Sequence, residues 1–178
     1  MIKTPSLPLD PRVLRRLQKA DEGAWQHLVE TWSRRLYSYI RYNVPTAEDA
    51  EDVTNETWAG AARGILTFDG RVAISTWLYT IAQHKIADWW RSSRPATTLN
   101  HSFPNVDNTL NLGLYEALAR LPDQTRQALL LRYREGLSVG EVADVLGRTY
   151  KATESLLSRG RSLLRVALDD PEEHHEAR

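Results

Sequence analysis

A break of 17 residues, 95–111, divides this sequence into two segments with helical patterns. The break contains two prolines and four asparagines, carries no Lys or Arg, and shows no apolar periodicity, a composition typical of a linker. On both sides apolar residues recur at helical spacing, whereas strand-like alternation with hairpin turns is missing. The sequence therefore predicts an all-α protein of two helical domains, residues 11–94 and 112–168, joined by a flexible linker and followed by an acidic tail at 169–178.

The first segment is predicted to hold four helices. A short amphipathic helix precedes a longer one that begins after Asp21 and is ended by Pro45. Thr46 caps the third helix. A turn signal at 68–71 separates it from a long fourth helix, whose apolar positions run through 74–90.

The second segment is predicted to contain a helix-turn-helix. A leucine stripe leads to Pro122, and the next helix stops at Gly136, because glycine adopts the left-handed conformation at low cost. Ser138 and Glu141 form a capping-box pattern before a short helix that ends at Gly147. A longer basic helix follows. Its predicted inward line consists of Thr153, Leu157, Gly160 and Leu164.

The outer face of this last helix carries candidate DNA contacts. In a helix-turn-helix, side chains near the N-terminus of the second helix reach base edges and phosphates in the major groove. The candidates are Arg148, Lys151, Ser155, Ser158, Arg159 and Arg161. A plain helical hairpin with a solvated basic face is the alternative.

A second cluster lies near the end of the fourth helix, where cations and aromatic residues interleave. Such a surface can neutralise phosphates and stack on unpaired bases, although Trp is more often a core residue. The cluster consists of Lys85, Asp88, Trp89, Trp90, Arg91 and Arg94.

A third cluster is acidic and lies at the start of the third helix. It consists of Glu48, Asp49, Glu51, Asp52 and Glu56. The helix dipole favours the first two carboxylates, but Asp52 and Glu56 lie one turn apart and repel each other. These two carboxylates therefore either have a basic partner or are simply solvated.

Composition excludes several kinds of protein. The absence of Cys rules out a disulfide framework, a Cys-ligated metal site and a cysteine nucleophile. With no signal-peptide pattern and no membrane span, we expect a cytoplasmic protein. No motif indicates catalytic residues, a cofactor, a metal or a small-molecule substrate. Net charge is zero, yet residues 112–168 carry nine basic and six acidic groups while 169–178 carry one and five, so nucleic-acid binding is not excluded.

Together, five ordered motifs resemble the extracytoplasmic-function (ECF) sigma factors of the sigma-70 superfamily. They are DAEDVTNETW (49–58), FDG (68–70), STWLYTIAQHKIADWWR (75–91), ALARLPDQTRQALLLRYREGLS (117–138) and EVADVLG (141–147). The resemblance implies a promoter-specificity subunit of RNA polymerase that has no catalytic activity of its own. It further implies sigma domains two and four, with no third domain between them.

The resemblance also assigns contacts with core polymerase. It matches the acidic cluster to the segment that binds the coiled coil of the beta-prime clamp. The matching residues are Asp49, Asp52, Asn55 and Glu56. The beta flap is the other implied polymerase contact, and an anti-sigma factor is the implied regulator.

For DNA, the resemblance implies that the loop from Phe68 to Trp77 receives a flipped base of the minus-ten element. His84 stands where the family usually has Asn. The implied minus-ten residues are Phe68, Asp69, Gly70, Arg71, Ser75, Trp77, His84, Lys85, Arg91 and Arg94. The implied minus-thirty-five residues are Arg148, Lys151, Glu154, Ser155, Ser158, Arg159 and Arg161.

Two residues of the last helix depart from the family pattern. Glu154 and Leu156 occupy positions where a basic residue is frequent. Glu154 either accepts a hydrogen bond from a cytosine amino group or offsets Arg159 or Arg161. Leu156, with Leu163, is expected to widen the apolar stripe.

Three questions stay open in the sequence. A dimeric helix-turn-helix regulator that acts without polymerase is the main competing function, although it leaves the acidic and Trp-rich clusters unexplained. His174 and His175 in the acidic tail either bind a metal or belong to a segment that competes with DNA for the basic helix. Composition does not decide whether the two domains pack together.

Overall fold

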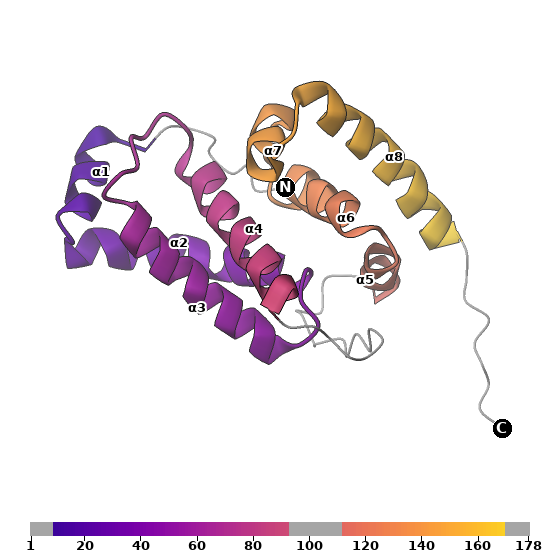
Figure 1. Cartoon of the computed structure of the whole chain (residues 1–178), viewed down its shortest axis with the longest axis horizontal. Helices are drawn as coiled ribbons and strands as arrows, with labels where there is room; N and C mark the ends of the chain where they lie inside the picture. The colour runs from indigo at the N-terminus through magenta and orange to yellow at the C-terminus, as the bar shows by residue number, and fades with distance from the viewer. Residues whose placement is uncertain (1–8, 93–111, 170–178) are drawn as a thin grey trace.

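The computed structural model describes residues 9–92 and 112–169, and every regular element in these ranges is a helix (Figure 1). The first group of helices consists of α1 (Pro11–Gln18), α2 (Glu22–Arg41), α3 (Ala47–Gly64) and α4 (Ile74–Ser92). The second group consists of α5 (Leu112–Ala119), α6 (Asp123–Leu129), the π-helical turn Leu130–Arg134, α7 (Val139–Leu146) and α8 (Tyr150–Asp169). The all-α prediction is confirmed. The predicted linker and the acidic tail beyond Asp169 lie outside the described residues.

The helix boundaries follow the local sequence closely. Thr46 and Ser138 each cap a helix through a complete capping box, α3 with Asp49 and α7 with Glu141. Gly147 ends α7 in the left-handed conformation, with a φ of 61°. The predicted caps of both helices are thus confirmed.

Two predicted helix ends differ from the structure. The second helix ends at Arg41 rather than at Pro45. After it the N–H of Asn43 donates to the carbonyl of Ile40 at 2.7 Å, a three-residue spacing, and the side chain of Arg41 donates to the carbonyl of Val44 at 2.9 Å. The helix expected to run to Gly136 changes at Leu130 into a π-helical turn. There the N–H of Glu135 donates to the carbonyl of Leu130 at 3.0 Å, a five-residue spacing.

One apolar core runs through both helical groups. In the first group, Leu36 and Ile40 of α2 and Leu78 of α4 are completely buried. In the second group, α8 packs against α6 at Gly160, where an added Cβ would come within 2.8 Å of Thr125 Cγ2. Glycine is therefore needed at this helix crossing. No helix in the described ranges is both long and apolar enough to cross a bilayer.

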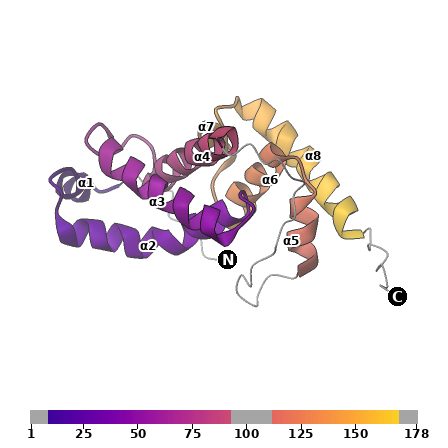
Figure 2. The same cartoon turned by 60° about the horizontal axis from the view of Figure 1, so that its bottom comes forward.

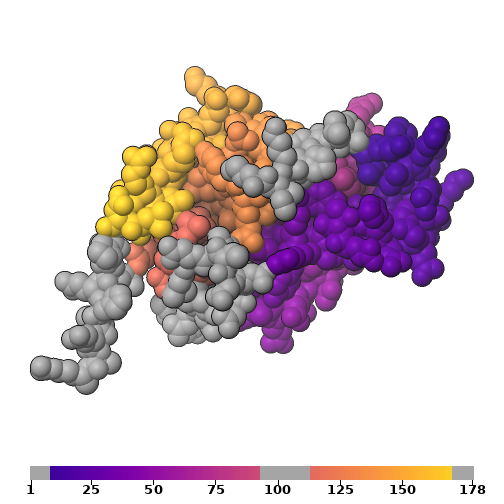
Figure 3. Space-filling model, turned by 180° about the vertical axis from the view of Figure 1, so that it is seen from behind, coloured from indigo at the N-terminus to yellow at the C-terminus, as the bar shows by residue number. Residues whose placement is uncertain are grey.

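The two groups are not separate bodies in this structure, since α7 packs on α4 (Figures 1 and 2). Seen from behind, the second group also lies directly against the first where the boundary is visible (Figure 3). This answers the question that composition left open. The packing covers one face of α4 and leaves the outer face of α8 uncovered.

Candidate nucleic-acid interface

The outer face of α8 presents most of the residues predicted to contact DNA. Its inward line is buried at Thr153, Leu157 and Gly160 and half-buried at Leu164, as predicted. The exposed predicted contacts are Lys151, Glu154, Ser155, Ser158, Arg159 and Arg161, while Arg148 in the preceding turn is half-buried.

The apolar stripe of α8 is wider than its inward line. Leu156 is 8% exposed and extends the stripe as expected, whereas Leu163 is 45% exposed and does not. The apolar stripe is therefore widest in the N-terminal half of the helix, next to the turn that precedes it. This fixes the orientation of the outer face near the helix start, where a recognition helix contacts bases.

Hydrogen bonds orient several cations around α8. Arg148 donates to Oε1 of Gln124 on α6, and Arg161 donates to the hydroxyl of Tyr133 at 2.7 Å. Within the described part of the chain Glu154 makes no ion pair, so neither Arg159 nor Arg161 is offset by it. The carboxylate of Glu154 faces outward, where it is available to a base edge.

The acidic cluster on α3 divides into two parts. Asp49 belongs to the capping box, where its carboxylate accepts from the Thr46 hydroxyl at 2.6 Å. Asp52, Asn55 and Glu56 are exposed further along the helix. Glu56 has the basic partner that its position called for, Lys85 on α4 at 3.1 Å.

A groove between α3 and α4 joins the acidic cluster to the cationic one. Its volume is about 510 Å³. The groove is lined by Asp52, Val53, Glu56, Lys85, Asp88, Trp89, Arg91 and Ser92. Sequence reasoning did not bring these two clusters together, because only the packing of α3 on α4 places them on opposite walls of one groove.

The two tryptophans at the end of α4 pack against the core. Trp90 donates from Nε1 to the carbonyl of Asn43 at 2.9 Å, and Trp89 stands against it edge-on, with ring centroids 4.9 Å apart. Both are half-buried. Of this pair, only Trp89 lines the groove.

Of the residues predicted in and beside the loop between α3 and α4, some are buried and others are exposed. Phe68 is 6% exposed and stacks on Trp77, with centroids 4.6 Å apart. Ser75 is also buried, and no partner for its Oγ is found among the described residues. Asp69 and Arg71 are exposed and pair with each other at 3.2 Å. An incoming base would therefore meet Asp69 and Arg71 before the ring of Phe68.

The remaining predicted residues lie along the exposed side of α4. His84 is exposed, and Arg91 pairs with Asp88 at 2.9 Å. Arg94 lies outside the described residues. The exposed predicted residues of the loop and of α4 thus lie on the surface of the first helical group.

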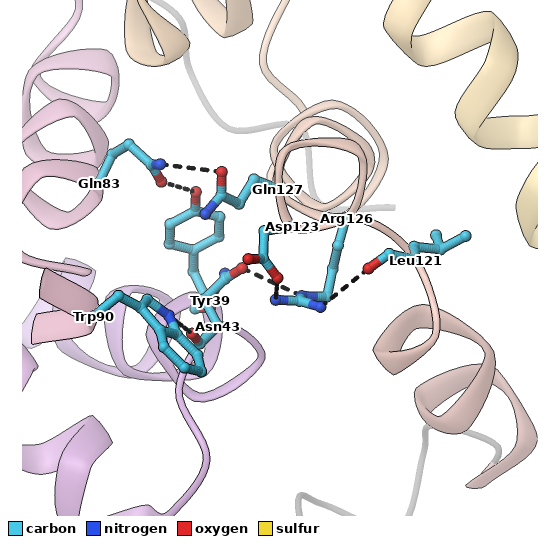
Figure 4. Close-up of polar contacts among 8 residues, drawn as sticks. All are labelled: Tyr39, Asn43, Gln83, Trp90, Leu121, Asp123, Arg126 and Gln127. Carbon is cyan, nitrogen blue, oxygen red and sulfur yellow. Dashed lines mark hydrogen bonds and ion pairs between the residues drawn. The ribbon is translucent and has the colours of Figure 1, made fainter. Parts of the chain in front are cut away.

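The opposite side of α4 is covered by the second helical group through polar contacts. Thr76 donates to Glu141 of α7 at 3.2 Å. Tyr39 donates to Gln83, which in turn donates to Gln127 of α6, each at 3.0 Å (Figure 4). Sequence reasoning missed these contacts. The available signal is that Thr76, Tyr79 and Gln83 form a polar line at helical spacing on a helix whose other inward positions are apolar.

Glu135 is the most deeply buried acidic side chain of this contact, at 2% exposure. It accepts from the hydroxyl of Tyr79 and pairs with Nε of Arg35 at 3.1 Å. Burial, and then the charge of Glu135, raises the pKa of Tyr79 well above its ordinary value. Nearby, Arg126 is also buried and donates to Asp123, to the Leu121 carbonyl and to Asn43 (Figure 4).

Comparison with known proteins matches both groups of helices to regions of one protein family. The family model of Sigma-70 region 2 matches residues 28–95, and the family model of Sigma-70, region 4 matches residues 112–164. The ECF RNA polymerase sigma factor BldN of Streptomyces coelicolor is 33% identical over 174 residues, which cover 89% of this chain and 66% of BldN.

Solved structures agree with this match. The structure of CnrH in complex with the cytosolic domain of CnrY has a TM-score of 0.72 at 26% identity, and the match covers 89% of this chain and 96% of that one. RpoE from Bartonella quintana, in complex with the anti-sigma factor NepR, also has a TM-score of 0.72, at 21% identity over 82% of this chain and 96% of that one. The second likeness is one of fold.

Proposed function

Because this chain belongs to the ECF sigma factors of the sigma-70 family, we propose that it binds core RNA polymerase, recognises minus-thirty-five and minus-ten promoter elements and promotes transcription initiation. One observation carries the proposal. A left-handed glycine turn leads into α8, whose inner line is buried while its polar outer face is exposed. That is the arrangement with which a helix-turn-helix enters the major groove.

The two elements are assigned to different helical groups. The outward residues of α8 and Arg148 would read the minus-thirty-five element. The loop at 68–77 and the exposed side of α4 would bind the minus-ten element. Extruding a base costs a few kcal/mol, which phosphate contacts from Lys85 and Arg91 would offset.

Core polymerase would bind the acidic wall of the groove. Asp52, Asn55 and Glu56 are exposed on α3, and the geometry suits a basic partner helix laid along them. Asp49 would contribute mainly as the cap that begins α3. The covalent chemistry of transcription then belongs to polymerase, and the chain acts in the cytoplasm, where core polymerase and DNA meet.

An anti-sigma factor would control this activity. RpoE from Bartonella quintana forms such a complex with NepR. Among the described residues, the groove between α3 and α4 and the outer face of α8 both remain open although the two helical groups are packed together. Both surfaces are therefore accessible to a separate protein that would block them.

Co-migration with core polymerase on gel filtration tests the proposal. We expect the wild-type chain to co-migrate with core and Asp52→Lys to bind at least about tenfold more weakly, because like charges meet at the interface. Glu51→Lys is the matched control, since it makes the same charge change on the same helix outside the groove. Failure of the wild-type chain to bind core, together with duplex binding in the absence of core, would instead indicate a conventional helix-turn-helix regulator.

A further inference from the structure

The short helix α1 carries a concentrated basic face that no surface described above includes. Arg12, Arg15, Arg16 and Lys19 fall within an arc of about 100° around its axis. All four are exposed, and α1 contains no acidic residue. Arg16 pairs with Asp21 at 2.8 Å, whereas Arg12, Arg15 and Lys19 have no acidic partner among the described residues.

The opposite face of α1 is attached to the loop between α3 and α4. Gln18 donates to the carbonyls of Ile65 and Phe68 at 3.2 and 3.1 Å. The turn at Gly70 lies on Leu14, since a Cβ at Gly70 would come within 3.2 Å of Leu14 Cδ2. Figure 1 shows α1 beside this loop and at the far end of the group from the C-terminus of α4. The basic face is therefore held in a fixed position next to the proposed minus-ten loop.

Helix stability explains only part of this face. Cations in the last turn of a helix interact favourably with its dipole, which accounts for Arg15, Arg16 and Lys19. Arg12 lies in the first turn, where the dipole disfavours a positive charge. A ligand with negative charges spaced along the helix would explain the whole set, because the face extends for about 10 Å from Arg12 to Lys19.

We propose that Arg12, Arg15 and Lys19 bind phosphates of the single DNA strand that continues past the minus-ten element. This inference rests on the proposed function. In that function, the duplex from the minus-thirty-five element approaches over Lys85 and Arg91, and a base is extruded at the loop. The strand leaves the loop on the other side, where α1 lies.

The observations favour DNA over an acidic protein as the ligand. The basic face adjoins the proposed DNA path, whereas the proposed polymerase contacts lie on α3 beside the groove. The positive charges also follow one line, as a nucleic-acid backbone requires. Lys and Arg contacts to phosphates make binding dependent on salt, with a slope of about 0.7 per phosphate for single strands.

The test measures binding of holoenzyme to two promoter fragments selected by transcription with this chain. In one fragment the non-template strand ends at the minus-ten element, and in the other it continues as several thymidines. We expect the overhang to tighten binding by wild type, and the triple variant R12Q/R15Q/K19Q to lose that gain. The slope of log affinity against log salt should fall by about 1.4 to 2.1 on the longer fragment only, for two to three phosphates.

The double variant R12K/R15K is the matched control, because it keeps both charges and should retain the gain. Thermal unfolding of the triple variant should change little, since the three side chains are exposed and the helix dipole favours Arg15 and Lys19 but disfavours Arg12. An equal loss on both fragments would overturn the inference and indicate an acidic protein contact. No loss on either would also overturn it. If wild-type holoenzyme bound neither fragment, the proposed function itself would fail.

Discussion

Glu154 is an acidic residue on a face whose neighbouring charges are basic, and it makes no ion pair in the described part of the chain. We therefore propose that Glu154 recognises a base rather than balancing the charge of a neighbouring arginine. A carboxylate accepts from the amino group of cytosine, whereas a Gln amide pairs with adenine. Glu154→Gln should accordingly change the preferred base at one minus-thirty-five position from cytosine to adenine.

One base contact contributes about 1–3 kcal/mol, so the preference should change by roughly fivefold to 150-fold. Selection from a randomised promoter library by the wild-type and variant chains measures it directly. Ser162→Ala on the same helix is the control and should leave the selected sequence unchanged. The same preferred base for Glu154→Gln and wild type would contradict the assignment.

At the level of elements, the contact between α8 and α6 depends on Gly160. An added methyl group would come within 2.8 Å of Thr125 Cγ2 and 3.3 Å of both Leu129 methyl groups, and both side chains are buried. Gly160→Ala should therefore lower the free energy of unfolding by about 1–3 kcal/mol.

Chemical denaturation of the full chain checks this prediction. Gly140→Ala in α7 is the matched control, because the nearest atom to its added Cβ is Ser138 Oγ at 3.9 Å. That variant should be as stable as wild type or gain up to about 1 kcal/mol from helix propensity. Equal stability of Gly160→Ala and Gly140→Ala would mean that α8 can move away from α6 without cost.

Most elements could be predicted from the sequence because their signals are local. The capping boxes at Thr46 and Ser138 and the glycine at Gly147 each act through neighbouring residues. The π-helical turn after Leu129 was not predicted, since its apolar spacing fits an ordinary helix equally well. Among the site residues, exposure of the α8 face followed from periodicity. The burial of Phe68 under Trp77 did not, because it depends on how the loop folds back.

For the whole molecule, the polar contact between the two helical groups is centred on Glu135. This carboxylate is 2% exposed and bonded to Tyr79 and Arg35 of the other group. A local pattern marks Tyr79 as a polar inward position but does not identify its partner, because the residues that Glu135 contacts lie 56 and 100 residues away. Its charged hydrogen bonds are worth about 1.5–3 kcal/mol each, which makes it the main polar link between the groups.

Glu135→Gln should weaken this link and shift the free chain toward separated groups. We expect the ratio of packed to separated chains to fall at least about tenfold. Small-angle X-ray scattering would then give a larger radius of gyration. Glu30→Gln, on the exposed face of α2, is the control and should leave the radius unchanged. A radius equal to that of wild type for Glu135→Gln would show that the other contacts between the groups hold them together without the charge of Glu135.

The packing should also weaken at alkaline pH. Burial, with a further contribution from the charge of Glu135, raises the pKa of both Tyr79 and Tyr39 in the packed state. A tyrosine whose pKa is raised by folding contributes its full stabilisation below its ordinary pKa of about 10, and loses it as the pH rises above that value. The radius of gyration should stay constant up to about pH 10 and then increase.

Tyr79→Phe tests the origin of this pH dependence, because it removes the ionisable hydroxyl and keeps the ring. The variant should show a smaller increase above pH 10 than wild type. The absorbance of tyrosinate should rise together with the radius in the wild-type chain. A rise in absorbance from all seven tyrosines without any change in radius would contradict the role of Tyr79.

In the function proposed above, this chain gives core RNA polymerase its promoter specificity. In vitro transcription from a randomised promoter library, with and without the chain, tests this role. We predict that transcripts depend on the chain and arise from templates enriched in two sequence elements at a fixed spacing. Transcription that is equally efficient without the chain, with no paired elements enriched, would contradict the claim.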